Sequence, residues 1–293
     1  MSDRVLISIT DGVADVVFNR ADKRNALDNA MFSAIAEAGE QLKSERGVRA
    51  VVLSGDGASF CAGLDFSSFQ AMAGGDNAEQ AATRSDGNPG QMKDGRITHL
   101  GQQVCWVWQE LEVPVIAAVH GHALGGGLQI ALGADIRIVH PDTKLSVREV
   151  HWGLVPDMTG TFMLSQIVRP DVAKELTVTA RVFSGAEASE MGLVTRLSDD
   201  PYGDAMELAT QIAGRSPGAV RGWWVWWQGR YCLRAAGLLS LQGCQGASGQ
   251  STGNTGTGIQ HLTVSSGSGV LDQDGRDQGG SNHGSSGPLS MGC

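Results

Sequence analysis

Three consecutive glycines, Gly125, Gly126 and Gly127, form the pattern in this chain that most directly suggests chemistry. They follow the apolar, β-branched run 115–119, which predicts a buried strand, and precede residues 128–132, which predict the first turns of a helix. Glycines at such a junction let a ligand approach backbone N–H groups, and a helix N-terminus favours negative charge. The pattern predicts a binding site, with a simple tight turn as the alternative.

A second glycine-containing strand exit occurs at residues 59–65, which read SFCAGLD. The triple-glycine stretch lacks the Lys-Ser/Thr pair of a phosphate-binding loop, and its glycine spacing does not match the dinucleotide fingerprint. The two exits together indicate a site built from backbone donors.

The elements that must position these loops alternate between strands and helices. Residues 5–10 and 13–18 predict a hairpin turned at Asp11 and Gly12, and short buried strands are predicted at 49–53 and 135–139. Helices are predicted after the N-cap Asp28 and over residues 97–112, 159–168, 171–179, 184–192 and 204–216. Residues 74–95 predict a polar surface loop. This alternation predicts an α/β fold with largely parallel strands.

Composition excludes several classes of protein. The 293 residues carry a formal net charge of −9 and no basic run, which argues against a nucleic-acid partner. Five widely spaced cysteines without a C-x-x-C pair predict reduced thiols and a cytoplasmic protein. No signal peptide opens the chain and no apolar run reaches membrane-spanning length, so we expect no membrane partner.

Five motifs, in order and spacing, resemble those of the crotonase superfamily, the enoyl-CoA hydratases and isomerases. They are NRADKRNAL at 19–27, FCAGLD at 60–65, VHGHALGGG at 119–127, EVHWGLVP at 149–156, and FSGAEA at 183–188 with GLV at 192–194. The resemblance covers a core domain of residues 1–221. It implies an α/β crotonase (ClpP-like) spiral of repeated β-β-α units, homotrimers or hexamers, and acyl-CoA substrates. Coenzyme A would enter as part of the substrate, without a further cofactor or a metal.

In that family, two backbone N–H groups hold the thioester carbonyl oxygen, and the matching positions here are Leu64 and Gly126. Such donors stabilise the enolate that forms when a proton leaves the carbon next to the thioester, and one donor lowers the barrier by about 3–4 kcal/mol. The positive charge of Lys23 and Arg24 suits the CoA phosphates, with a solvated surface pair as the alternative. The resemblance implies CoA contacts at Lys23, Arg24, Ala26, Cys61, Ala62, Leu64, Asp65 and Gly126.

Two glutamates handle protons in the hydratases, and the matching positions here are Gln129 and Glu149. An amide neither accepts nor donates a proton, so Gln129 is expected to position water or substrate. A double-bond isomerase needs only one base that takes a proton and returns it elsewhere, so the pattern favours isomerisation. An enoyl-CoA hydratase of fatty-acid β-oxidation and an acyl-CoA-binding protein with little or no catalysis remain open.

Asp157 resembles the second acid–base carboxylate of the dienoyl-CoA isomerase branch, although that branch has an aspartate where this chain has Gln129. Asp157 could instead cap the helix predicted near residue 159, and Glu149 could belong to a surface ion pair. Cys61 as a nucleophile is a weaker alternative, since the family needs only a small residue at that position. His120 and His122 as metal ligands are also weaker, since the sequence offers no coherent set of further ligands. His151 and Trp152 are expected to line or flank the acyl pocket.

The resemblance ends at Arg221. Residues 223–227 read WWVWW, and a Gly-, Ser- and Gln-rich segment without helical or strand periodicity follows. Our hypothesis is that residues 222–293 arise from a shifted reading frame and replace the family's helical C-terminal region, with a natural disordered tail as the alternative. Translating the other two frames of the DNA tests this hypothesis. If neither frame gives a charged, amphipathic C-terminus, it is wrong.

Overall fold

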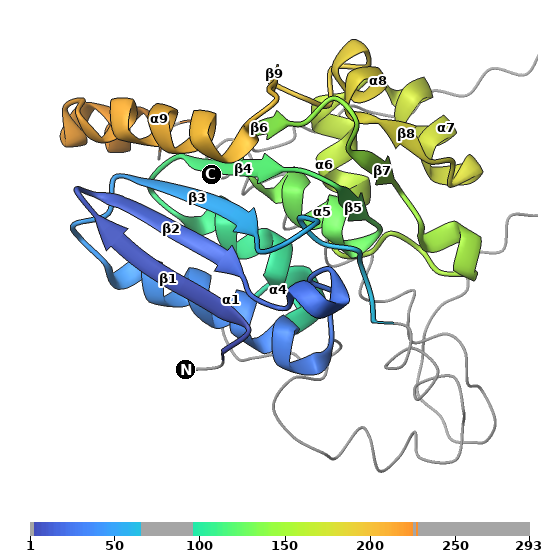
Figure 1. Cartoon of the computed structure of the whole chain (residues 1–293), viewed down its shortest axis with the longest axis horizontal. Helices are drawn as coiled ribbons and strands as arrows, with labels where there is room; N and C mark the ends of the chain where they lie inside the picture. The colour runs from blue at the N-terminus through green and yellow to red at the C-terminus, as the bar shows by residue number, and fades with distance from the viewer. Residues whose placement is uncertain (1–2, 66–95, 225–226, 228–293) are drawn as a thin grey trace, which may run out of the picture. The chain divides into compact units, whose positions relative to one another are not determined.

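A computed structural model of the chain describes residues 3–65, 96–224 and 227 (Figure 1). All of these residues belong to one unit of the chain, residues 1–250. The predicted loop at residues 74–95 lies outside the described residues, as does nearly all of the segment 222–293. The proposed boundary at residue 221 therefore stays a prediction.

A six-stranded sheet in the order β1-β2-β3-β4-β6-β9 organises the described residues. β1 (Val5–Thr10) and β2 (Val13–Phe18) form the predicted antiparallel hairpin, with Val5 opposite Phe18. The remaining strands add in parallel; they are β3 (Ala50–Gly55), β4 (Val115–Val119), β6 (Ile136–Val139) and β9 (Arg196–Leu197). A mixed α/β fold with mainly parallel pairing is confirmed.

Helices cover both faces of this sheet (Figure 1). Alternate residues of one strand point to opposite faces, so Val51 joins the core formed with α1 (Asn29–Ser44) and α4 (Leu100–Trp106). Val52 joins a smaller cluster with alanines of α9 (Pro201–Ala213). This double coverage explains why every residue of β4 is buried.

Three short strands form a second sheet, in the order β5-β7-β8. They are β5 (His122–Leu124), β7 (Lys144–Ser146) and β8 (Phe183–Ser184). A parallel bridge joins Cys61 to Ala123, and another joins Leu64 to Leu27. The second glycine-containing segment therefore lies between residue 27 and β5, which brings it beside the triple glycine at the end of β5.

The remaining α-helices follow the sequence prediction with small changes of boundary, whereas the 3₁₀ turns at residues 21–23 and 149–152 were not predicted. α5 (Gly126–Gly133) begins at the middle glycine, and the predicted helix 97–112 is α4 followed by the 3₁₀ turn η2 (Val107–Glu110). Asp28 caps α1 by accepting the Met31 N–H. The others are η1 (Ala21–Lys23), η3 (Glu149–Trp152), α6 (Gly160–Ile167), α7 (Pro170–Thr179) and α8 (Gly185–Glu190). No helix among the described residues is long and apolar enough to cross a membrane.

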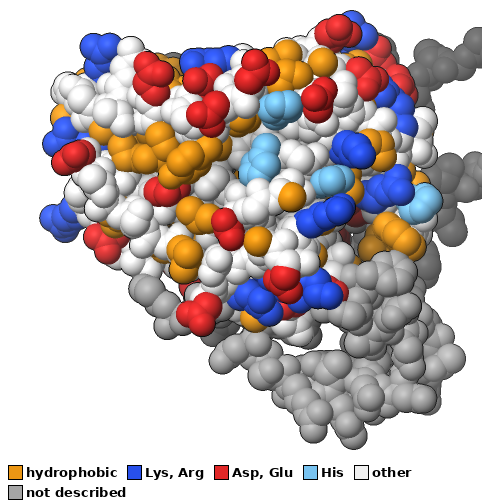
Figure 2. Space-filling view, in the orientation of Figure 1, with side chains coloured by type: hydrophobic (Ala, Val, Ile, Leu, Met, Phe, Trp, Pro, Cys, Tyr) orange, Lys and Arg blue, Asp and Glu red, His pale blue; other side chains and the backbone are white. Residues whose placement is uncertain are grey.

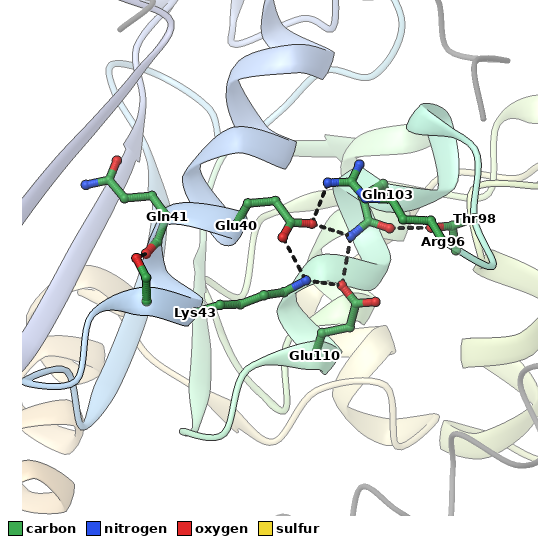
Figure 3. Close-up of polar contacts among 8 residues, drawn as sticks. Glu40, Gln41, Lys43, Arg96, Thr98, Gln103 and Glu110 are labelled. Carbon is green, nitrogen blue, oxygen red and sulfur yellow. Dashed lines mark hydrogen bonds and ion pairs between the residues drawn. The ribbon is translucent and has the colours of Figure 1, made fainter. Parts of the chain in front are cut away.

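A polar network ties α1 to the segment that follows residue 95 (Figure 3). The Glu40 carboxylate accepts hydrogen bonds from Arg96 at 2.6 Å and from the amide of Gln103 at 3.2 Å. Lys43 pairs with Glu40 at 3.0 Å and with Glu110 at 2.7 Å. The network fixes α4 against α1, and α4 in turn packs against α5, where Cys105 lies against Gly133.

Candidate active site

A pocket of about 340 Å³ lies where β5 ends and α5 begins. It is lined by three segments, residues 62–64, 124–126 and 148–154. The predicted residues Leu64, Gly126 and Glu149 are thereby brought together from positions far apart in the chain. Its lining residues are Ala62, Gly63, Leu64, Leu124, Gly125, Gly126, Arg148, Glu149, Trp152 and Leu154.

The N–H group of Leu64 is directed by its neighbours. The carbonyl oxygen of Gly63 accepts the Leu27 N–H at 2.8 Å, and the Asp65 N–H donates to the Leu27 carbonyl at 3.0 Å. All described peptide bonds are trans, so the N–H of Leu64 points opposite to the Gly63 carbonyl in the same peptide plane. The Leu64 N–H therefore points away from Leu27.

The N–H group of Gly126 is directed by the start of α5. The carbonyl of Gly125 accepts the Gln129 N–H at 3.0 Å and so points along the helix. The Gly126 N–H shares that peptide plane and points out of the helix N-terminus, where the helix dipole favours negative charge. Gly125 has φ 52° and ψ −120°, a conformation that residues with a Cβ rarely adopt.

Gly63 allows the two donor segments to lie against each other. A Cβ at this position would come within 2.5 Å of the Leu124 carbonyl oxygen and 3.8 Å of the Gly126 nitrogen. Its φ of 89° is also in the left-handed region. A side chain at residue 63 would therefore both strain the backbone and separate Leu64 from Gly126.

Gln129 is fully buried in α5 and is held at both ends of its amide. Its Oε1 accepts the Gly160 N–H at 2.7 Å, and its Nε2 donates to Glu149 Oε1 at 2.6 Å. Because the backbone N–H fixes which end of the amide is the oxygen, the NH₂ group must face Glu149. The sequence predicted that Gln129 positions water or substrate. In the structure, both of its hydrogen bonds are made to protein groups, so what Gln129 holds directly is the Glu149 carboxylate.

Glu149 is the first residue of η3 and faces the pocket. Burial raises the pKa of its carboxyl group, while hydrogen bonds from the backbone and from Gln129 oppose this shift. Its second oxygen, Oε2, is buried and has no hydrogen-bond partner among the described residues. Glu149 is therefore no surface ion pair, and burial with a raised pKa is the environment of a carboxyl group that can both take and return a proton.

Asp157 lies on the turn between η3 and α6. Burial raises the pKa of Asp157, and the positive charge of His99 opposes this shift. The charge of Asp157 also raises the pKa of Glu149. The alternative that Asp157 caps α6 is wrong, because Thr159 occupies the N-cap position. Asp157 is not among the residues that line the 340 Å³ pocket.

The proposed CoA contacts are divided between the pocket and its surroundings. Ala62 lines the pocket, whereas Lys23 and Arg24 are exposed at the end of η1. Asp65 is buried and pairs with Arg20 at 2.7 Å, and the Ala26 carbonyl accepts a second Arg20 N–H at 2.9 Å.

The weaker alternatives find no support in the structure. Burial raises the pKa of Cys61 to about 12, and its thiol donates to the Asn25 carbonyl at 3.1 Å, so it is a poor nucleophile. His120 contacts the Gly57 carbonyl, and His122 contacts Ser59. Across the described residues, no cluster of three or more His, Cys, Asp or Glu could hold a metal ion.

Sequence reasoning missed Arg148 and Leu154 as pocket residues, although it expected Trp152 nearby. Both lie on or next to the 3₁₀ turn η3, and such a short turn has no periodicity that a sequence can reveal. The family-like segment 149–156 was the signal that could have identified Leu154, whereas Arg148 lies just before that segment.

A family model described as Enoyl-CoA hydratase/isomerase matches residues 8–223. The probable enoyl-CoA hydratase EchA14 of Mycobacterium tuberculosis is 35% identical over 207 residues, which are 71% of this chain and 74% of that protein. The peroxisomal Delta(3,5)-Delta(2,4)-dienoyl-CoA isomerase of Arabidopsis thaliana is 31% identical over 217 residues, which are 72% of this chain and 75% of that protein.

Among solved structures, an enoyl-CoA hydratase/isomerase from Mycobacterium paratuberculosis superposes with a TM-score of 0.73. The match covers 83% of this chain and 92% of that structure at 23% sequence identity. At this identity, the likeness shows the fold.

Proposed function

The chain belongs to the enoyl-CoA hydratase/isomerase family of enzymes, and on that premise we propose that it moves a carbon–carbon double bond in an enoyl-CoA thioester. The observation that carries this proposal is the pair formed by Gln129 and Glu149. Glu149 is the one carboxylate among the described residues that line the pocket, and an amide fills the position beside it. We also propose that coenzyme A takes part only as a portion of the substrate.

The substrate's carbonyl oxygen would bind between the N–H groups of Leu64 and Gly126. Supporting this are their directions away from Leu27 and out of α5, and the close approach of Gly63 to the Gly126 nitrogen. Fixed backbone donors stabilise the negative charge that develops on the oxygen as the enolate forms. They need no rearrangement during the reaction because strands and a helix hold them.

Glu149 would take a proton from the carbon next to the thioester and return it to a carbon farther along the chain. Its raised pKa supports both steps, because a carboxylate that ionises closer to neutral pH is a stronger base and its acid form still returns the proton. The amide of Gln129 donates to Oε1 and holds the carboxylate in place, and Oε2 has no hydrogen-bond partner among the described residues. Gln129 is therefore a positioning residue in this proposal.

Hydration is the second candidate function, and the curated name of the Mycobacterium tuberculosis relative favours it. A dienoyl-CoA isomerisation that also uses Asp157 is favoured by the Arabidopsis relative and by the electrostatic coupling of Asp157 to Glu149. Hydration acts on a 2-enoyl-CoA, whereas each isomerisation acts on a thioester whose double bond lies farther from the carbonyl group. Supplying the enzyme with each substrate therefore separates hydration from isomerisation.

The decisive experiment compares a 3-enoyl-CoA with a 2-enoyl-CoA of the same short chain length. Isomerisation creates the conjugated thioester absorbance from the first substrate, whereas hydration removes it from the second. We expect the first reaction to be the faster one, and rapid loss of absorbance from the 2-enoyl-CoA would overturn the isomerase proposal.

Glu149→Gln should lower kcat for the preferred substrate by about 10²–10⁴-fold, the range typical of a lost general base. An exposed acidic residue, Glu207 on α9, provides the control as Glu207→Gln. A Glu149→Gln enzyme that keeps its activity would show that another residue is the base. Calorimetric CoA binding without turnover of either substrate would instead favour an acyl-CoA-binding protein.

A further inference from the structure

A row of basic residues runs across the segments that form the pocket. Arg24 lies beside residue 62, because the Arg24 carbonyl accepts the Ala62 N–H at 2.9 Å. The carbonyl of His122 accepts the Cys61 N–H at 3.0 Å, and His122 pairs in register with Lys144 of β7. Arg24, His122 and Lys144 thus lie on neighbouring stretches of backbone. Figure 2 shows Lys, Arg and His side chains gathered over the region of β5 and β7.

This row lies on the same face as the pocket. Residues two apart on a strand point to the same side, so His122 shares its face with Leu124, which lines the pocket. Lys144 shares its face with Ser146, the register partner of Leu124. A ligand that extends from the pocket along β5 would therefore meet these side chains.

The His122 ring is held in place by a buried partner. Its Nδ1 lies 2.9 Å from the hydroxyl oxygen of Ser59, which is fully buried. Because Nδ1 is used in this contact, Nε2 on the other side of the ring is the nitrogen that an external acceptor would meet. Partial burial lowers the pKa of His122, and the positive charges of Arg24 and Lys144 lower it further.

We propose that His122, together with Arg24 and Lys144, binds a phosphate group of coenzyme A and takes up a proton when it does so. This inference rests on the proposed function, because it requires CoA to occupy the pocket. Asp65, the acidic residue at the end of the adjacent segment, forms an ion pair with Arg20 at 2.7 Å.

The direction of the proton movement follows from the charges. In the free protein, the two cations and burial favour the neutral ring, whereas a phosphate anion beside Nε2 favours the charged ring. Binding therefore raises the pKa of His122. Between the free and the bound pKa, CoA binding consumes protons, so affinity falls as pH rises by up to about tenfold per pH unit for a single proton.

Isothermal titration calorimetry of the full chain with CoA measures this uptake. Titrations at pH 6.5 in buffers of different ionisation enthalpy give the number of protons bound for each CoA. We expect the wild-type protein to take up as much as one proton for each CoA bound. The His122→Asn variant should take up much less. His120→Asn is the matched control, because His120 contacts the Gly57 carbonyl and should leave the proton count unchanged.

Titration with dephospho-CoA separates the protons taken up by the protein from those released by the phosphate monoester of CoA. The phosphate monoester of CoA has a second pKa near 6 and can lose a proton on binding cations. Dephospho-CoA lacks this group, so its uptake should exceed that of CoA if the row binds the diphosphate. If the row binds the monoester, dephospho-CoA should lose both affinity and His122-dependent uptake.

NMR titration of the His122 ring in the wild-type protein gives the same answer without relying on a variant. Its pKa should be higher in the CoA complex than in the free protein. CoA that binds with an unchanged His122 pKa, or with equal proton counts in wild type and His122→Asn, would overturn this inference alone. Failure of CoA to bind at all would overturn the proposed function as well.

Discussion

Because residue 129 is a glutamine, Glu149 faces an amide and not a second carboxyl group that could transfer a proton. Its amide lies 2.6 Å from Glu149 Oε1, a distance at which two carboxylates could not both be ionised. Gln129→Glu would place a carboxyl group at that position, with its other oxygen still able to accept the Gly160 N–H. The resulting pair would share one proton and titrate as a unit.

We therefore expect Gln129→Glu to hydrate 2-enoyl-CoA at least about tenfold faster than the wild type, because a hydratase uses one acid and one base together. The kcat–pH profile should change from a single rise, set by ionisation of Glu149, to a bell. Gln129→Met is the control, since it removes both hydrogen bonds and should lower both reactions. A Gln129→Glu enzyme without added hydration would show that the amide does not limit it.

At the scale of the elements, the turn before α6 connects the two halves of the site. Thr159 is fully buried and has φ 76°, a left-handed conformation that is costly for a β-branched residue. The next residue, Gly160, donates to Gln129, and the preceding residue, Met158, packs against Gly126. The strained turn is what directs these neighbours toward the site.

This strain predicts an unusual order of stability for two variants. In ordinary helical conformations, alanine is more stable than glycine by about 1 kcal/mol. At residue 159 we expect the reverse, with Thr159→Gly more stable than Thr159→Ala by about 1 kcal/mol, because only glycine adopts this φ freely. Urea unfolding of the two variants measures the difference. Equal stability, or a more stable alanine variant, would show that the turn relaxes at little cost.

The sequence predicted most elements that have clear patterns. The hairpin at Gly12, the helix capped by Asp28 and the buried run 115–119 all occur as predicted, and the structural likeness confirms the crotonase-type fold. β5 was missed because three residues beginning with a histidine show no strand periodicity. The start of α5 at Gly126 was missed because glycine disfavours helices, yet a Cβ at Gly127 would clash with the Cys61 carbonyl at 2.2 Å.

Within the site, the sequence could identify the candidate residues, but it could not predict the hydrogen bonds and ion pairs between them. The resemblance identified Leu64, Gly126 and Glu149 as candidates, and these residues meet at one pocket. The bond from Gly160 to Gln129 could not be predicted, because it depends on a left-handed Thr159, which no local propensity favours. Asp65 was expected to contact CoA, but its pairing with Arg20 depends on the tertiary fold.

At the scale of the whole molecule, the raised pKa of Asp135 makes the free energy of unfolding depend on pH. Its Oδ2 accepts the Val115 N–H at 2.8 Å, which links the start of β4 to the approach to β6. Burial raises the pKa of Asp135 to about 7, while the Val115 N–H and the charge of Arg137 oppose this shift. A carboxyl group with a raised folded-state pKa stabilises the protein at low pH, and this contribution is lost as pH rises from about 4 to about 7.

The contribution of this group to the free energy of unfolding should accordingly fall between about pH 4 and about pH 7, by at most about 1.4 kcal/mol per pH unit. Asp135→Asn should flatten the fall, because asparagine does not titrate and still offers an oxygen to the Val115 N–H. Denaturant unfolding at several pH values measures both slopes, with the exposed Asp142→Asn as control. Parallel slopes for wild type and Asp135→Asn would mean that Asp135 ionises normally.

The donors proposed for the carbonyl oxygen belong to the main chain, and this has a consequence for genetics. An alanine scan leaves the N–H of Leu64 in place, so at that position it would report the packing of the side chain and not the donor. The same scan would score Gly63 and Gly125 as essential, because a methyl group at Gly63 would clash with the Leu124 carbonyl and the φ of 52° at Gly125 strains any residue with a Cβ. Mutational maps of this enzyme would thus mark the glycines beside Leu64 and at the start of α5, and they would miss the N–H group of Leu64 itself.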